Sequence, residues 1–133
     1  MKSAFLDTNI LVYAVDPRDS RKREMALEII RSLSGGWSLS VQVLQEFYWA
    51  SVRKLSISPS DARAITELWS RQRVVQPTPQ LVIGAIDTSE RYRISFWDAL
   101  IVEAAVAGQC DVLYTEDLSH GQVIRGITVT NPF

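Results

Sequence analysis

The sequence predicts an α/β sandwich built on a mainly parallel sheet. Short apolar runs with strand character alternate with amphipathic helical segments, which is typical of helices packed on such a sheet. The chain has 133 residues, 47% hydrophobic and 22% charged, and shows no internal repeat or low-complexity segment. This composition predicts one globular domain over residues 1–133.

The first elements are marked by helix caps and by glycine. A strand over residues 4–6 ends at Asp7-Thr8-Asn9, residue types that commonly cap a helix, and an apolar helical turn follows at 10–14. After a polar loop, an amphipathic helix begins at Arg21 and stops at Gly35-Gly36. We predict a second short strand at 37–39.

The middle of the chain predicts three helices and one strand. A helix over 41–54 has one apolar side and another side that carries Gln42, Glu46 and Arg53. A second helix starts at Ser58 and runs to about residue 72, and a strand follows at 74–75. Thr78-Pro79 is a good cap and first-turn pair for a helix that reaches about residue 92.

The last third of the chain contains its most apolar helix. Ser95 caps this helix and Gly108 closes it, and no wide polar face remains, so we expect it to be buried against the sheet. A strand over 112–114 ends at residues 115–117, and the last predicted strand lies around 127–129.

Composition excludes several classes of function. The net charge of -1 and a sequence pI near 5.8 do not fit a nonspecific duplex-binding protein. One cysteine, Cys110, and one histidine, His120, cannot supply a tetrahedral zinc site or an internal disulfide. No secretory signal opens the chain and no apolar stretch approaches the ~20 residues of a membrane span, so we expect a cytoplasmic protein without a membrane segment.

Acidic residues follow two predicted strands at the edge where an open parallel sheet binds its ligands. Asp7 follows the first strand and Asp117 follows the fourth, so both would face one crevice if those strands are neighbours. Taken alone, Asp7 fits a helix N-cap equally well, and Asp117 is more typical of a turn.

Two further acids have competing explanations. Asp98 lies one turn into the most apolar helix, where it fits a capping box with Ser95 and also the same crevice as Asp7. Glu46 shares a polar helix side with Gln42 and Arg53, and periodicity alone favours a solvated face for it.

A cluster of three or four carboxylates without histidine or cysteine favours a hard cation, Mg²⁺ or Mn²⁺. Such carboxylates cannot all stay ionised unless a divalent ion neutralises them, and that ion can activate water and stabilise a leaving oxygen. The pattern therefore predicts metal-dependent hydrolysis of a phosphodiester.

At these same residues the chain resembles the PIN-domain ribonucleases, and more narrowly the VapC-type toxins of bacterial toxin–antitoxin pairs. The resemblance runs nearly end to end, and the segments that carry it are Phe5-Leu6-Asp7-Thr8-Asn9-Ile10-Leu11-Val12-Tyr13, Gln45-Glu46-Phe47, Ser95-Phe96-Trp97-Asp98-Ala99-Leu100-Ile101, Leu113-Tyr114-Thr115-Glu116-Asp117-Leu118 and Asn131-Pro132-Phe133. Each segment alone is a weak signal, whereas four acids in the family's order are a strong one.

The resemblance implies roles that the periodicity does not show. It makes Asp7, Glu46, Asp98 and Asp117 the acidic cluster, which reverses the interpretation of Glu46 as a solvated residue. Asp7 and Asp98 would be the principal metal ligands, Asp117 would hold the metal directly or through water, and Glu46 would position water or a second ion. The polar residues that would support them are Thr8, Asn9 and Thr115, and Glu116 could share the role of Asp117.

The resemblance also implies a three-layer α/β/α fold with a five-stranded parallel sheet, a homodimer, an RNA substrate and inhibition by a cognate antitoxin protein. For contact with RNA phosphates the sequence offers a set of basic residues, although a solvated helix face is the more common explanation of such a set: Arg18, Arg21, Lys22, Arg23, Arg91 and Arg93. The four tryptophans lie in apolar runs and are interpreted as core residues. A metal mechanism does not require His120 as a general acid.

Two other functions compete with the nuclease. One is a PIN-like scaffold that binds RNA or a partner without cutting. The other is a phosphoryl-acceptor domain with Asp7 as nucleophile, which the sequence disfavours because Asn9 stands where a second acid is typical and lysines occur only at positions 2, 22 and 54.

Overall fold

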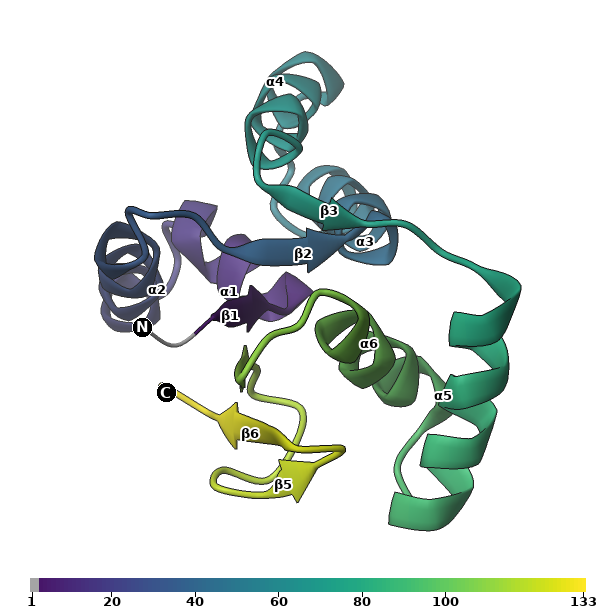
Figure 1. Ribbon diagram of the computed structural model, residues 1–133. Helices are drawn as coiled ribbons and strands as arrows, with labels where there is room; N and C mark the ends of the chain where they lie inside the picture. The colour runs from purple at the N-terminus through teal and green to yellow at the C-terminus, as the bar shows by residue number, and fades with distance from the viewer. Residues whose placement is uncertain (1–2) are drawn as a thin grey trace.

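The computed structural model describes residues 3–133 and confirms an α/β fold with a mostly parallel sheet flanked by helices (Figure 1). The sheet has the strand order β3-β2-β1-β4-β6-β5. The strands are β1 (Ala4–Leu6), β2 (Ser38–Ser40), β3 (Arg73–Val75), β4 (Val112–Tyr114), β5 (Val123–Ile124) and β6 (Ile127–Thr130). The helices are α1 (Thr8–Val15), α2 (Ser20–Ser32), α3 (Val41–Arg53), α4 (Pro59–Trp69), α5 (Pro79–Tyr92) and α6 (Phe96–Ala107).

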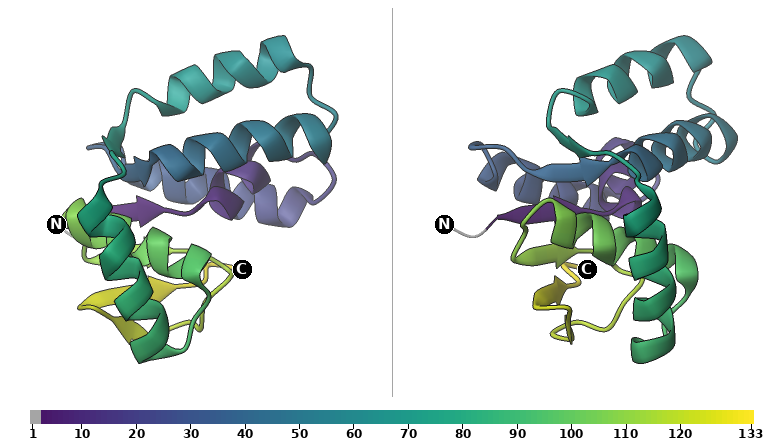
Figure 2. Two further views of the ribbon diagram at one scale, coloured as in Figure 1. Left: turned by 90° about the vertical axis from the view of Figure 1, so that its right-hand side faces the viewer. Right: turned by 45° about the vertical axis from the view of Figure 1, so that its right-hand side comes forward.

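The connections place the helices in two layers. The chain moves outward through β1, β2 and β3 and then crosses back to β4, so right-handed crossovers put α1–α4 on one face and α5 and α6 on the other, as Figure 2 shows. The expected three layers are therefore present. In the described part of the chain, no helix has the length and apolar character needed to cross a membrane.

The expectation of five strands is wrong, because the sheet has six. The five predicted strands form its parallel part, and β5 adds a short antiparallel strand at the edge beside β6. Arg125 and Gly126 make the reversal with φ angles of 53° and 80°. A two-residue strand followed by this turn has no period long enough to be recognised in the sequence.

The predicted helix caps form as hydrogen bonds. The Thr78 hydroxyl accepts from the Leu81 backbone N–H at 3.1 Å, and the Ser95 hydroxyl accepts from that of Asp98 at 3.0 Å. The helix that begins after Ser58 ends at Trp69, three residues before the expected end. These caps fix where α5 and α6 start, and the start of α6 fixes the place of Asp98.

The core lies between the sheet and the inner faces of α1, α3 and α6. Phe5, Leu113 and Val102 are fully buried, and six of the twelve residues of α6 are buried. The interpretation of all four tryptophans as core residues is wrong for two of them, because Trp49 and Trp97 expose 60% and 65% of their surface. Apolar neighbours in the sequence did not decide their burial, since both lie on the outer side of their helices.

Strands β1 and β4 are adjacent and parallel, with Leu6 opposite Tyr114. The backbone N–H of Asp7 donates to the Tyr114 carbonyl at 3.0 Å, directly past the ends of both strands. The two segments that carry Asp7 and Asp117 therefore start at the same point of the sheet, as expected for neighbouring strands.

Candidate active site

One pocket of about 370 Å³ collects the predicted acids at the carboxyl edge of the sheet. Its walls come from α1 and the loop after it, from one side of α3 along its length, from the N-terminal end of α6 and from the segment after β4. It is lined by Asp7, Thr8, Asn9, Val12, Tyr13, Asp16, Arg18, Gln42, Glu46, Ala50, Lys54, Trp97, Asp98, Ile101, Glu116 and Asp117. The structure thus brings together all four acids of the expected cluster.

Asp7 lies at the bottom of this pocket with 4% of its surface exposed. One carboxylate oxygen accepts from the Thr8 backbone N–H at 2.7 Å and the other from the Thr115 hydroxyl at 2.8 Å. Burial raises the pKa of Asp7 from 3.8 to about 7, against these hydrogen bonds and with the help of the charges of Asp117 and Glu46. Asp7 is thus the N-cap of α1 and also a carboxylate that takes up a proton more readily than an exposed one does.

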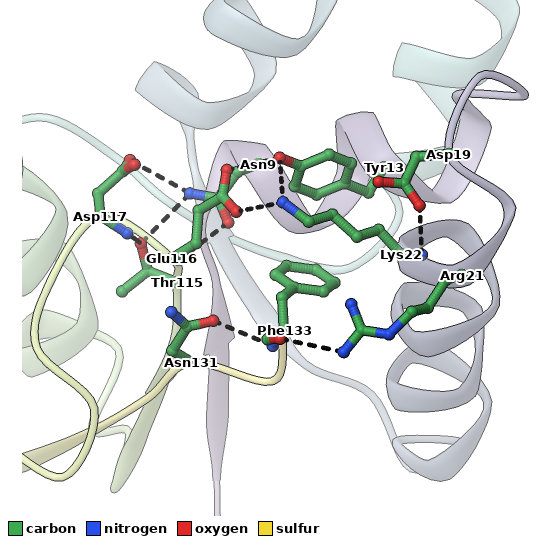
Figure 3. A network of polar contacts seen from close by, with 10 residues as sticks. All are labelled: Asn9, Tyr13, Asp19, Arg21, Lys22, Thr115, Glu116, Asp117, Asn131 and Phe133. Carbon is green, nitrogen blue, oxygen red and sulfur yellow. Dashed lines mark hydrogen bonds and ion pairs between the residues drawn. The ribbon is translucent and has the colours of Figure 1, made fainter.

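Asn9 and Thr115 hold the loop that carries Asp117 (Figure 3). The Asn9 amide nitrogen donates to Asp117 Oδ2 at 3.2 Å and to the Thr115 hydroxyl at 3.3 Å. The Asp117 backbone N–H donates to the same hydroxyl at 3.1 Å. Thr115 therefore links Asp7 to Asp117 through its hydroxyl, and Asn9 contacts both Thr115 and Asp117.

Glu116 points to a different set of partners from those of Asp117 (Figure 3). Its carboxylate accepts from the Tyr13 hydroxyl at 2.7 Å and forms an ion pair with the Lys22 ammonium at 3.2 Å. Lys22 also lies over the Tyr13 ring, 4.6 Å from its centre. The charge of Glu116 is thus already compensated within the fold, whereas among residues 3–133 the Asp117 carboxylate accepts from the Asn9 amide alone.

Glu46 reaches the pocket from α3 and joins it to α1. Its Oε1 accepts from the Thr8 hydroxyl at 2.7 Å, and Gln42 on the preceding turn donates to Oε2 at 3.5 Å. Glu46 is exposed, as its place on a polar helix face predicts, and it also lines the pocket that holds the other acids. Arg53 does not share this face, because its guanidinium lies over the Trp49 ring.

Asp98 enters the pocket from the first turn of α6. Its backbone N–H is capped by Ser95, but its carboxylate makes no return bond to Ser95, so only half of the expected capping box forms. Burial raises the pKa of Asp117, and the negative charge of Asp98 raises it further. These two acids therefore repel each other across the pocket.

Several pocket residues were not anticipated by the sequence analysis, among them Tyr13, Asp16, Lys54 and Trp97. One signal was available: Gln42, Glu46, Ala50 and Lys54 recur every four residues and form one side of α3. Of the basic residues proposed for RNA contact, Arg18 lines the pocket, where it pairs with Asp16, whereas Lys22 is paired with Glu116 beside it. His120 lies outside the pocket and accepts from the Asn131 backbone N–H.

The donor set fits a hard divalent cation. All four acids offer oxygen ligands, and within residues 3–133 no lysine or arginine lies within ion-pair distance of Asp7, Glu46, Asp98 or Asp117. In that same range, no three histidine, cysteine or acidic side chains converge closely enough to hold an ion as they lie. Binding a cation therefore requires the more exposed carboxylates to turn inward.

Comparisons with known proteins agree with this arrangement. The family model described as PIN domain matches residues 4–124. A search of curated proteins found no match.

The fold is similar to that of solved toxin–antitoxin structures. A chain of a toxin–antitoxin complex from Klebsiella pneumoniae is 18% identical with a TM-score of 0.77, and 98% of each chain is covered. VapC20 of Mycobacterium tuberculosis, described as a sarcin-ricin loop cleaving toxin, is 23% identical with a TM-score of 0.70, covering 84% of this chain and 87% of that one. A chain of DNA-bound VapBC from Salmonella typhimurium is 22% identical with a TM-score of 0.71 over 100% of both chains.

The family match spans every acid of the pocket, from Asp7 to Asp117, and the chain belongs to the PIN domain family.

Proposed function

We propose that this chain is a metal-dependent endoribonuclease of the VapC toxin type, which hydrolyses RNA phosphodiester bonds at the acidic pocket as a single domain. One observation carries the proposal: Asp7 is a buried carboxylate without a cationic partner in the described chain, surrounded by three further acids. Burying such a charge is costly, so the fold retains it for a ligand that compensates it.

The residues that would hold the ion are Asp7 and Asp98, with Asp117 acting directly or through water and Glu46 positioning water or a second ion. When bound, Mg²⁺ or Mn²⁺ would supply the positive charge that this cluster lacks and the electrostatic activation needed for phosphodiester hydrolysis. The all-oxygen donor set supports these two ions over zinc.

The chain's own groups prepare the acids for this task. Thr115 and the Thr8 backbone N–H occupy both oxygens of Asp7 and so fix the plane of its carboxylate. Asn9 restrains Asp117, and the Thr8 hydroxyl restrains Glu46. Asp7, Asp117 and Glu46 thus each accept from a neutral hydrogen-bond donor rather than from a competing cation.

We assign the fourth acidic position to Asp117 rather than to Glu116. Lys22 and Tyr13 both bind the Glu116 carboxylate, and their removal would be needed before it could serve a metal. Glu116 instead neutralises Lys22 next to the pocket.

We further propose that the protein pairs with a cognate antitoxin and forms a homodimer, and that it acts in the cytoplasm. Support comes from the solved structures with this fold, several of which are described as toxin–antitoxin complexes, including VapBC2 of Rickettsia felis bound to promoter DNA. The only cysteine, Cys110, is buried and unpaired, which is consistent with a reducing compartment.

The test is cleavage of total cellular RNA and a panel of structured RNAs by the purified protein with Mg²⁺, Mn²⁺ or chelator. The proposal expects cuts at discrete sites that need the metal and disappear in Asp7→Asn and in Asp98→Asn. If folded wild-type protein leaves every RNA intact with either metal but still binds RNA, the chain is a PIN-like scaffold instead.

A further inference from the structure

The acidic pocket has a second, cationic end. Helices α1 and α3 lie side by side and start at the same edge of the sheet (Figure 2). At their N-terminal ends the Thr8 hydroxyl donates to Glu46, and beyond their C-terminal ends Arg18 Nη1 donates to the Lys54 carbonyl at 3.4 Å. The pocket is therefore a groove between two helices that run in the same direction.

Between its ends, helices α1 and α3 contribute the uncharged side chains Val12 and Ala50 to this groove. On α3 the side formed by Gln42, Glu46, Ala50 and Lys54 faces the groove, and α1 contributes Val12. Lys54 lies eight residues beyond Glu46, which is about 12 Å along an α-helix. A ligand that spans the groove therefore meets carboxylates at one end and cations at the other.

Both cations are available to a ligand. The Arg18 guanidinium is 64% exposed, and two of its nitrogens are fixed on the buried Asp16 carboxylate at 2.9 Å and 3.0 Å. This bidentate contact orients the guanidinium and leaves other N–H groups facing outward. Lys54 is exposed, and in the part of the chain that the structure describes no carboxylate lies within ion-pair distance of its ammonium.

We propose that Arg18 and Lys54 form a phosphate-binding subsite that holds an RNA strand while a neighbouring phosphodiester lies at the acids. The inference rests on the proposed nuclease function and deepens it. The two residues are positioning residues, since they lie a helix length away from the acids and do not reach the reacting phosphate.

The charges along the groove favour a single RNA strand over an acidic peptide. A peptide carboxylate held by Lys54 would leave the rest of that peptide facing Glu46, Asp98 and Asp117 without compensation. A nucleic-acid strand presents its second phosphate to those acids together with the metal they are proposed to hold. The protein's near-neutral charge also favours a single strand over a duplex.

The experiment measures cleavage of a single-stranded RNA oligonucleotide over a range of salt concentrations. The variants are Lys54→Gln, which leaves the Arg18–Asp16 pair intact, and the double variant Arg18→Gln/Lys54→Gln. The matched control is Arg31→Gln/Arg71→Gln, which removes two exposed charges that do not line the groove. Because Arg18→Gln leaves Asp16 buried without its partner, Asp16→Asn/Arg18→Gln is added to separate a folding defect from lost binding.

We expect KM to rise about 5-fold in Lys54→Gln and at least about 20-fold in the double variant, because each phosphate contact contributes separately. The value of kcat should stay within about threefold of wild type, since neither residue meets the reacting phosphate. The slope of log KM against log salt should fall by about 0.7 for each cation removed. The control should leave KM, kcat and the slope unchanged.

Unchanged KM and slope in Lys54→Gln and the double variant would overturn the subsite, and so would an effect equal to that of the control. An acidic peptide that binds wild type but not Lys54→Gln, while RNA binding stays unchanged, would assign the groove to a protein partner and overturn it as well.

If wild type cleaves no RNA, the nuclease proposal fails by itself, and the subsite is then judged by binding of a 2′-O-methyl oligonucleotide. The subsite is supported if the slope of log Kd against log salt for this oligonucleotide falls by about 0.7 for each cation removed. An unchanged slope overturns it.

Discussion

Asp7 at the end of β1 and Glu103 in the middle of α6 are both almost fully buried, with 4% and 7% of their surfaces exposed. Glu103 has a cation, since Arg125 donates to both of its oxygens at 3.1 Å and 3.3 Å, and the Thr88 hydroxyl donates at 3.1 Å. Among the residues that the structure describes, Asp7 accepts from neutral donors alone, Thr8 and Thr115, and the charges of Asp117 and Glu46 lie close to it. The fold therefore compensates one buried charge and leaves the other for a ligand.

The surroundings of Glu103 show how far the chain adapts to hold a structural charge. A Cβ added at Gly84 would lie 2.7 Å from Glu103 Oε1, so a glycine on α5 makes room for the carboxylate. Arg125 reaches it from the turn between β5 and β6. This pair ties α5, α6 and the edge hairpin together, and nothing comparable surrounds Asp7.

The largest expected effect is a difference in RNA cleavage between variants of Asp7 and of Glu103. Asp7→Asn should lower RNA cleavage on the order of 10³-fold, because the ligand that meets the metal loses its charge. Glu103→Gln, a change of the same kind at a buried acid, should stay within about threefold of wild type for the same amount of folded protein. Equal loss in both variants would remove the distinction between a functional and a structural carboxylate.

The second effect is on stability rather than activity. Here a change at the Glu103 site should matter more than a change at Asp7. Arg125→Gln leaves Glu103 buried without a cation and should lower the free energy of unfolding by about 2–3 kcal/mol, a value discounted because Arg125 is 43% exposed. Urea titration measures this loss. Glu103→Gln/Arg125→Gln should recover most of it, and Arg63→Gln, which breaks the exposed pair with Glu67, should cost less than about 0.5 kcal/mol.

A third, smaller contrast lies within the pocket itself. Asp117→Asn should lower cleavage about 10- to 100-fold, whereas Glu116→Gln should change it less than about fivefold, because Lys22 and Tyr13 already hold that carboxylate. Initial rates at saturating Mg²⁺ measure both. The reverse order would place Glu116 at the fourth acidic position.

The smallest effect is a pH dependence of stability in protein freed of metal by chelation. The pKa of Asp7 is raised from 3.8 to about 7 by burial, so the folded state binds this proton more tightly than the unfolded state does. Its contribution is then greatest below pH 4 and is lost as the pH rises towards 7. Asp7→Asn should remove this fall, as seen by denaturant unfolding at pH 5 and pH 8. A fall of equal size in the variant would assign the pH dependence to other groups.

Local chemistry in the sequence predicted much of the fold. Thr78 and Ser95 cap helices where expected, and the parallel strands start and end close to the predicted positions, because apolar runs and capping side chains act over a few residues. The short edge strand β5 was missed, because it has two residues and forms by pairing with β6 rather than from a local sequence pattern.

The site was predictable in its acids but not in their surroundings. Asp7 and Asp117 follow from the strand ends, whereas Glu46 required the family resemblance, because its neighbours on α3 indicate a solvated face. The pairing of Lys22 with Glu116 and the approach of Lys54 to Arg18 join segments 94 and 36 residues apart. No local pattern reports such contacts.

The measurement that tests the central claim most directly is Mn²⁺ binding by electron paramagnetic resonance, in wild type, Asp7→Asn and Glu103→Gln. If Asp7 is held without a cation in order to bind one, wild type and Glu103→Gln should bind the ion with the same affinity and Asp7→Asn should lose at least about tenfold. Equal affinity in wild type and Asp7→Asn would contradict the account.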